Sequence, residues 1–171
     1  ISDFYFYNST IYQNSATNYG GNLYDFTNTS PGAGSDLILA RNSIVAGGVA
    51  GNADSSDIYN GDYLQDLDYN LFQNVTHNSP GQHYCSGVQN DNPCTHDITG
   101  VSPLIASSLA NNGGSTLTLA DSSTSPGKGY VPFASGLCNN APGTNVDQRG
   151  YTRGAGGVCD VGAYEFAGTA P

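Results

Sequence analysis

The chain has 171 residues, with 14 Asp and Glu but only 4 Lys and Arg, which gives a formal net charge of −10. So few bases cannot neutralise a phosphate backbone, and this excludes nucleic-acid binding. No run of about 18 apolar residues is present, so we expect no membrane-spanning segment. The scarcity of Met, Glu, Lys and Arg excludes a helical bundle.

The sequence predicts a strand that begins almost at the first residue of the chain. Ile1 is not an initiator Met, and an aromatic run at residues 4–7 follows almost at once. We therefore expect Ile1 to be a processed or truncated end of a longer precursor, from which a signal peptide could have been lost.

Residues 3–80 are expected to form strands separated by turns. Gly, Asn, Ser and Pro cluster between runs that are rich in aromatic and branched residues, and no stretch shows a helical period. The expected strands are Phe4–Tyr12, Asn22–Phe26, Leu37–Val45, Asp57–Tyr59 and Tyr63–Phe72.

A weak internal repeat predicts how these strands stack. Residues 8–11 (Asn-Ser-Thr-Ile) recur at 42–45 (Asn-Ser-Ile-Val) and more loosely at 70–72 (Asn-Leu-Phe), so that the Asn residues lie 34 and then 28 positions apart. Repeats of this length are typical of solenoids. We therefore predict an all-β fold, a parallel β-helix of about three coils in which Ile11 lies over Val45. Asn8, Asn42 and Asn70 are expected to form a hydrogen-bonded ladder rather than a functional site.

The second half of the chain differs in character from the first. Residues 1–100 are expected to hold the coils, with a polar loop that contains Cys85 and Cys94. Residues 101–171 lose the repeat, are rich in Gly and Asn turns, and hold three of the four bases. We expect them to be a disulfide-pinned C-terminal cap on the end of the solenoid, within the same domain.

Four cysteines indicate an oxidising compartment. Cys85, Cys94, Cys138 and Cys159 include no Cys-x2-Cys pair and have no paired His, a spacing that fits two disulfides better than zinc. Three pairings are open, and we favour the one between sequence neighbours, Cys85–Cys94 with Cys138–Cys159. The even cysteine count and the lack of Met and Trp predict an exported protein, extracellular or on the cell surface.

Three Asn-x-Ser/Thr sequences are candidates for glycosylation, at Asn8, Asn28 and Asn74. A chain rich in Asn, Ser and Thr also produces such sequences by chance, so both interpretations stay open.

The C-terminal motifs resemble those of a known family. The runs that carry the resemblance are Asp97–Ile105, Leu109–Thr118, Asp147–Gly150 and Cys159–Glu165. In this order they are similar to the choice-of-anchor Q domain proteins, bacterial surface proteins whose β-helix repeats resemble those of polymorphic outer-membrane proteins. The resemblance implies a right-handed parallel β-helix exported to the cell surface, and it implies no shared enzymatic activity.

The densest charged set has two interpretations. Its members are Asp147, Arg149, Arg153, Asp160 and Glu165. Two carboxyl groups near an arginine could form the site of a glycosidase or lyase. We favour instead ion pairs that hold the cap in place.

A second acidic group lies in the coils, at Asp54, Asp57, Asp62, Asp66 and Asp68. Asp62, Asp66 and Asp68 are weak calcium candidates, but no calcium-loop motif is present, so we favour a solvated acidic face and expect no cofactor. The three histidines, His77, His83 and His96, are expected at the surface, because no convergence on a metal can be shown.

Eight tyrosines lie in the coils: Tyr5, Tyr7, Tyr12, Tyr19, Tyr24, Tyr59, Tyr63 and Tyr69. They suit glycan binding or chain-to-chain packing, and equally the ordinary preference of Tyr for strands. We predict a non-enzymatic extracellular structural or adhesive protein that self-associates into a fibre or layer. The alternative is a β-helix protein that binds or cleaves polysaccharides, with surface glycans as partners.

Overall fold

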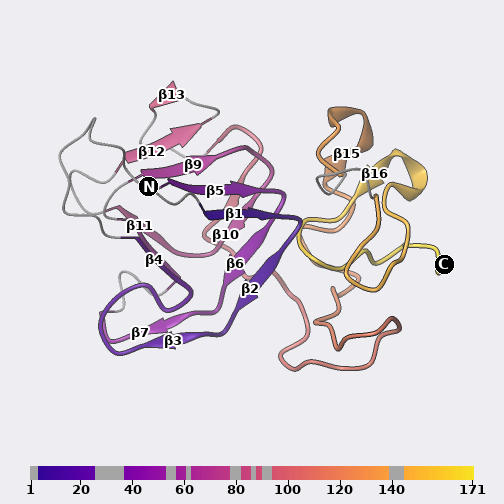
Figure 1. The fold of residues 1–171 in the computed structure, drawn as a ribbon, viewed down its shortest axis with the longest axis horizontal. Helices are drawn as coiled ribbons and strands as arrows, with labels where there is room; N and C mark the ends of the chain where they lie inside the picture. The colour runs from indigo at the N-terminus through magenta and orange to yellow at the C-terminus, as the bar shows by residue number, and fades with distance from the viewer. Residues whose placement is uncertain are drawn as a thin grey trace.

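The computed structural model describes residues 4–25, 37–52, 57–60, 63–77, 82–85, 88–89, 94–138 and 145–171. Within these ranges the fold is all-β, with mostly parallel strands in stacked sheets (Figure 1). The described helical elements are two short 3-10 turns, η2 (Phe133–Ser135) and η3 (Ala155–Gly157). No helix among the described residues is long and apolar enough to cross a lipid bilayer.

The chain visits the same sheets in turn and then returns to them. The strands of the first half are β1 (Phe4–Tyr7), β2 (Thr10–Tyr12), β3 (Ser15–Ala16), β4 (Leu23–Asp25), β5 (Leu37–Arg41), β6 (Ile44–Ala46), β7 (Val49–Ala50), β8 (Ile58–Asn60), β9 (Tyr63–Asp66), β10 (Leu71–Phe72), β11 (Val75–His77), β12 (Gln82–Cys85), β13 (Val88–Gln89) and β14 (Ile98–Thr99). The strand orders in these sheets are β1-β5-β9-β12-β13, β14-β10-β6-β2, β11-β8-β4 and β3-β7.

Pairing in register stacks equivalent side chains on one another. Ile11 pairs with Val45, and Val45 pairs with Phe72, in parallel strands. The predicted placement of Ile11 over Val45 is therefore confirmed. Because side chains alternate along a strand, the neighbouring positions of the same sheet, such as Ile44 and Leu71, face the other way.

Three predicted strands are broken by sharp corners. Phe4–Tyr12 divides at Asn8 and Leu37–Val45 divides at Asn42, each with φ of 47°. Tyr63–Phe72 divides after Asp66, where Asp68 and Tyr69 have φ of 75° and 60°. These left-handed conformations turn the chain from one sheet into the next, and Asn and Asp tolerate them better than most residues do.

The two ends of the stack differ. Among the described strands, β1, β2 and β4 are the outermost members of their sheets at one end. At the other end β12 pairs antiparallel with the short strand β13, and Cys85 at the end of β12 is bonded to Cys94. The parallel order of this sheet therefore stops at a cross-linked turn of the chain.

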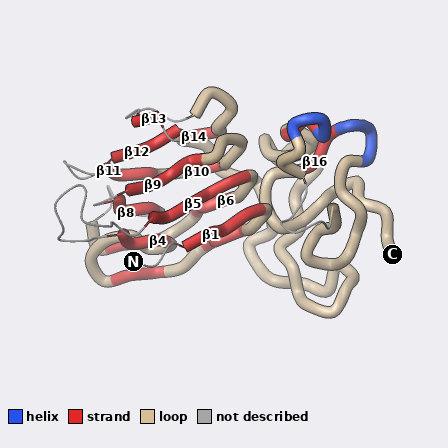
Figure 2. Tube along the Cα trace, turned by 45° about the horizontal axis from the view of Figure 1, so that its top comes forward, coloured by secondary structure: helices blue, strands red, loops and turns tan. Residues whose placement is uncertain are grey.

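Residues 101–171 lie beside the sheets and not at their end, which corrects the predicted end cap (Figure 2). This region is mostly loop, with β15 (Val131–Pro132) paired antiparallel to β16 (Val158–Cys159). Val131 and Val161 pack against Ile44 and Leu71 on the outer face of the sheet β14-β10-β6-β2. The apolar outer face of this sheet explains the placement, because it needs a cover.

A separate core lies between the sheets. It is formed by Phe6, Ile38, Ala40, Val45, Ile58, Leu64 and Phe72. Leu64 is fully buried at the middle of β9, between β5 and β12.

Leu64→Ala should lower the free energy of unfolding by about 3 kcal/mol, because it leaves a cavity at a site paired on both sides. Urea denaturation measures the change. Leu117→Ala, at a side chain 53% exposed, is the matched control and should stay within about 0.5 kcal/mol of the wild type. Equal effects of the two substitutions would contradict this core.

Candidate functional site

The amide ladder is present for two of its three predicted members. Asn42 donates from Nδ2 to Oδ1 of Asn8, and both side chains are buried. Asn70 does not join them: its Nδ2 donates to the Ala40 carbonyl and to Asp66 Oδ1, and the Asn42 Oδ1 atom has no hydrogen-bond donor within the part of the chain that the structure describes. Since Leu71 pairs with Ile44, Tyr69 and not Asn70 is in register with Asn42.

Asn70 belongs instead to a neighbouring polar column with Ser9, Ser43 and Asp97. The Ser9 N–H donates to Ser43 Oγ (3.1 Å), the Ser43 N–H to Asn70 Oδ1 (3.0 Å), and the Asn70 N–H to Asp97 Oδ1 (2.8 Å). Each side chain thus binds the backbone N–H of the equivalent residue before the neighbouring strand of the sheet. This column was not predicted, although a polar residue directly precedes each of the strands β2, β6, β10 and β14.

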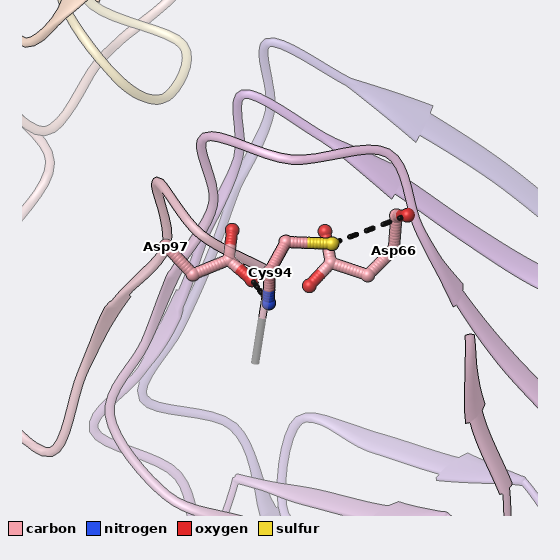
Figure 3. Close-up of side chains that lie close together, drawn as sticks. All are labelled: Asp66, Cys94 and Asp97. Carbon is pink, nitrogen blue, oxygen red and sulfur yellow. Dashed lines mark hydrogen bonds between the residues drawn. The ribbon is translucent and has the colours of Figure 1, made fainter. Parts of the chain in front are cut away.

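The last member of this column, Asp97, lies next to a second carboxyl group, that of Asp66 (Figure 3). We call this end of the stack, where β12 pairs with β13, the closed end. Asp66 is fully buried, and its Oδ1 accepts from Asn70 Nδ2 (2.7 Å) and from the Asp68 N–H (2.8 Å). Asp97 Oδ2 accepts from the Cys94 N–H (2.9 Å). Burial raises the pKa of Asp97 from 3.8 to about 9, and a hydrogen bond with Asp66 and the charge of Asp66 add to the rise. The two carboxyl groups therefore share a proton at neutral pH.

A carboxylate oxygen of each of these two aspartates lies within 4.8 Å of Cys94 Sγ, a spacing that could hold a metal ion. However, the Cys94 sulfur is bonded to Cys85 and offers no thiolate. Two carboxyl groups alone do not supply the six to eight oxygens that calcium prefers. The geometry of this cluster therefore fits a proton better than a metal.

The predicted acidic face does not form as a solvated surface, because Asp57 and Asp66 are fully buried. Asp57 Oδ1 accepts from Asn22 Nδ2 (2.8 Å) and from the Gly48 N–H (2.5 Å), and burial raises its pKa. Asp54 and Asp62 lie outside the described residues. Of the predicted calcium residues, the structure therefore describes only Asp66 and Asp68.

Asp68, the third calcium candidate, contacts a histidine. Its Oδ2 lies 2.6 Å from His96 Nδ1, and the His96 ring stacks on Tyr69 at 4.6 Å between centroids. His96 is exposed, as predicted for the histidines. His77 and His83 lie in β11 and β12, in strands where their side chains are outside the description.

The three candidate glycosylation sites have different environments. Asn8 is buried and bonded to Asn42, so the folded chain has no room for a glycan there, which corrects that prediction. Asn74 is exposed between β10 and β11 and stays a candidate. Asn28 lies outside the described residues.

Both disulfides of the favoured pairing are present, Cys85–Cys94 and Cys138–Cys159. The second lies in the core between the C-terminal region and the sheet. It joins the end of β16 to the chain that follows η2.

The predicted cap ion pairs form in the C-terminal region. Arg149 donates from Nη2 and Nε to Asp147 Oδ2 (2.6 and 2.9 Å), and its guanidinium lies between the rings of Tyr151 and Tyr164. Asp147 also accepts the backbone N–H groups of Arg149, Tyr151 and Glu165. With these bonds, Asp147 is fully used in holding loops together.

Arg153 forms the second pair, with Glu165 Oε2 at 3.4 Å. It also donates to the carbonyl oxygens of Asp160 (3.1 Å) and Gly162 (2.6 Å). Asp160 is not an ion-pair partner, because its carboxylate oxygens accept the N–H groups of Gly129 and Phe166. The sequence analysis missed a sixth member of this cluster, the buried Asp121.

A hollow of about 470 Å³ lies between the edge strand β2 and the C-terminal region. No charged side chain lines it; its walls are formed by Thr10, Ile11, Tyr12, Gln13, Asn14, Ser107, Ser108, Leu109 and Leu119. Gln13, one of the lining residues, has φ of 56°, a conformation that is uncommon for residues other than Gly.

The tyrosines do not form one continuous stripe among the described residues. Tyr59 is buried and packs against Tyr19 (4.7 Å) and Tyr24 (5.3 Å). On another sheet, Tyr7 lies under the Arg41 guanidinium at 4.3 Å. Tyr69 belongs to neither group, because it packs against His96 and Tyr130. The described tyrosines of the first half therefore form separate groups around Tyr59, Tyr7 and Tyr69.

Comparison with protein-family models, with curated proteins and with solved structures found no match to this chain.

Asp97→Asn should flatten the dependence of stability on pH. Between about pH 4 and pH 9 the folded protein holds a proton that the unfolded chain has released, so this site stabilises the fold most at low pH and less as pH rises. The substitution removes up to ~1.4 kcal/mol per pH unit of that slope. Urea denaturation at several pH values measures it, and parallel curves for both proteins would contradict the shared proton.

Arg149→Lys should lower the free energy of unfolding by about 3 kcal/mol, because one ammonium cannot replace the bidentate bond and the stacking between two rings. Thermal unfolding measures the loss. Lys128→Arg, which keeps the charge of a half-buried base over the Phe166 ring, is the control and should leave the melting temperature unchanged. If both variants melt together with the wild type, Arg149 does not have this role.

Proposed function

We propose that the chain is a right-handed parallel β-helix segment of an exported, non-enzymatic structural or adhesive surface protein. One observation carries the proposal: β1, β2 and β4 are the edge strands of three sheets, and all three lie at the same end of the stack. Edge strands at one end of a parallel stack are a template on which another chain can pair. Surface display, which the resemblance to choice-of-anchor Q domain proteins implies, is part of the same proposal.

The difference between the two ends of the stack favours a closed dimer rather than a fibre. A fibre needs two complementary open ends. At the other end one sheet stops at β13, which is short, antiparallel and next to the Cys85–Cys94 bond, and the other two sheets stop at β14 and β11, which are only two and three residues long. Short edge strands make this end the poorer template. We therefore propose that two copies associate through the β1–β2–β4 edge about a two-fold axis.

A structural role is supported by how the buried acids are used. Asp147 and Asp160 bind backbone N–H groups on both carboxylate oxygens, which leaves little capacity for acid–base chemistry. Two disulfides are compatible with an oxidising, extracellular setting.

Phe4→Lys should abolish self-association, because it places a charge on β1 at a side chain 52% exposed. Sedimentation velocity over a range of concentrations should show the wild type approaching twice the monomer mass and the variant staying monomeric. Leu117→Lys, in the C-terminal region, is the matched control and should associate like the wild type. The proposal is contradicted if the wild type is monomeric at every concentration, or if the Phe4→Lys variant still associates.

The uncharged hollow beside β2 favours a second candidate, binding of a neutral sugar unit. Sugars present hydroxyl groups and apolar C–H faces, which match the amides and hydroxyls of Gln13, Ser107 and Ser108 and the ring of Tyr12. Because no carboxyl group lines the hollow, its chemistry supports binding rather than cleavage.

Gln13→Ala with Ser108→Ala should weaken binding of a neutral disaccharide at least ~10-fold, since about 1.4 kcal/mol of hydrogen bonding is lost. Amide shifts in an NMR titration measure it, with Ser123→Ala as the control outside the hollow. If the double variant shows the same amide shifts on titration as the wild type, the sugar does not bind in this hollow.

A further inference from the structure

The buried charge cluster of the C-terminal region is unbalanced. Its described members are the acids Asp121, Asp147, Asp160 and Glu165 and the bases Arg149 and Arg153, all of them buried. With every group ionised, the cluster holds two more negative than positive charges. A buried excess of charge is costly unless protons remove it.

Two of the four acids are stabilised as carboxylates, and one clearly is not. Asp147 and Asp160 accept several backbone N–H groups each, as described above. Asp121 is 6% exposed, and its Oδ2 atom has no hydrogen-bond partner among the described residues. Burial, aided by the negative charges of Asp160 and Glu165, raises the pKa of Asp121 to about 8. Burial likewise raises the pKa of Glu165 to about 7.

The same cluster binds the segment Asp160–Ala163, which packs against the sheet. On one side Arg153 binds the carbonyls of Asp160 and Gly162, and Glu165 Oε2 accepts the Asp160 N–H (3.0 Å). On the other side the Gly162 N–H donates to the Asn42 carbonyl (3.0 Å) and the Ala163 N–H to Thr10 Oγ1 (3.0 Å). Any movement of the cluster is therefore transmitted to this contact.

We propose that the cluster is a proton-dependent lock: with Asp121 and Glu165 protonated the C-terminal region stays docked on the sheet, and with all four acids ionised the segment Asp160–Ala163 detaches. Detachment withdraws Val161 from the apolar outer face formed by Ile44 and Leu71. The fold thus carries a conformational device that responds to pH near neutrality.

Every described charged group that faces Asp121 belongs to the cluster itself, namely Asp160, Arg153, Glu165 and Arg149. Arg149 is flanked by Tyr151 and Tyr164, and Asp147 faces Arg153. The sheet residues that bind the docking segment, Thr10 and Asn42, carry no charge. Arg41, next to Asn42 in the chain, lies over the Tyr7 ring. The sheet therefore supplies no counter-charge when Asp121 ionises.

The direction of the effect follows from proton binding. When the segment Asp160–Ala163 is detached, Asp121 and Glu165 have their ordinary pKa values. The docked form therefore holds extra protons at every pH between about 4 and 8. Docking is strongest at acidic pH. From about pH 7 to pH 8 the opening constant rises about 10-fold, of which about 5-fold comes from the proton of Asp121 and about 2-fold from that of Glu165. Above pH 8 it levels off.

Amide hydrogen exchange by NMR on the full, disulfide-bonded chain tests the lock. The opening constants of the Gly162 and Ala163 amides should rise about 10-fold between about pH 7 and pH 8, while that of the Leu71 amide inside the sheet stays constant. Asp121→Asn should reduce this rise to about 2-fold, because it fixes the neutral form at position 121 and leaves only Glu165 to titrate. Asp68→Asn, outside the cluster, should keep the wild-type profile.

The proposal is overturned if Gly162 and Ala163 open equally at all pH values, if Leu71 opens in parallel with them, or if Asp121→Asn follows the wild type. Carboxyl NMR on the wild type gives a second reading that does not depend on the variant's folding. Titration of Asp121 close to pH 8 supports the lock, and titration at the ordinary value for Asp overturns it.

Discussion

Burial of one sheet on both faces is the constraint on which the rest of the structure depends. In the sheet β14-β10-β6-β2, Val45 and Phe72 face the core between the sheets, whereas Ile44 and Leu71 face the C-terminal region. A sheet that is apolar on both faces cannot leave either one in water. The loops of the C-terminal region, which have little regular structure of their own, are therefore held in place by the surface that they cover.

The polar column fixes which residues meet in that sheet. Strands of two or three residues specify register weakly, and a slip of one residue would exchange the two faces. The bonds from Ser9 to Ser43, Ser43 to Asn70 and Asn70 to Asp97 occur only in the observed register. The column thus stabilises the register at the corner directly before the sheet that needs it most.

Local patterns in the sequence predicted the strands and the disulfide pairing, but not the corners or the ladder register. Asn8, Asn42 and Asn70 look equivalent by residue type, yet the third coil is one residue out of step, and Tyr69 takes the corner position. Asp121 was missed because it is an isolated acid in the sequence, whose partners come from residues 149–165. Lateral docking of residues 101–171 was also missed, because it depends on Val131 and Val161 meeting a face that exists only after the coils have stacked.

The acidity of the chain therefore has a different meaning in the folded protein from the one its composition indicates. Six acids, Asp57, Asp66, Asp121, Asp147, Asp160 and Glu165, are buried among the described residues, against two buried arginines. Backbone N–H groups neutralise some of this charge. Burial raises the pKa of Asp121 to about 8 and that of the partly buried Asp97 to about 9, so protons lower the negative charge of the folded protein further. The missing charges lie at the closed end of the stack and beneath the docked region, the two places where raising the pH would strain the fold first.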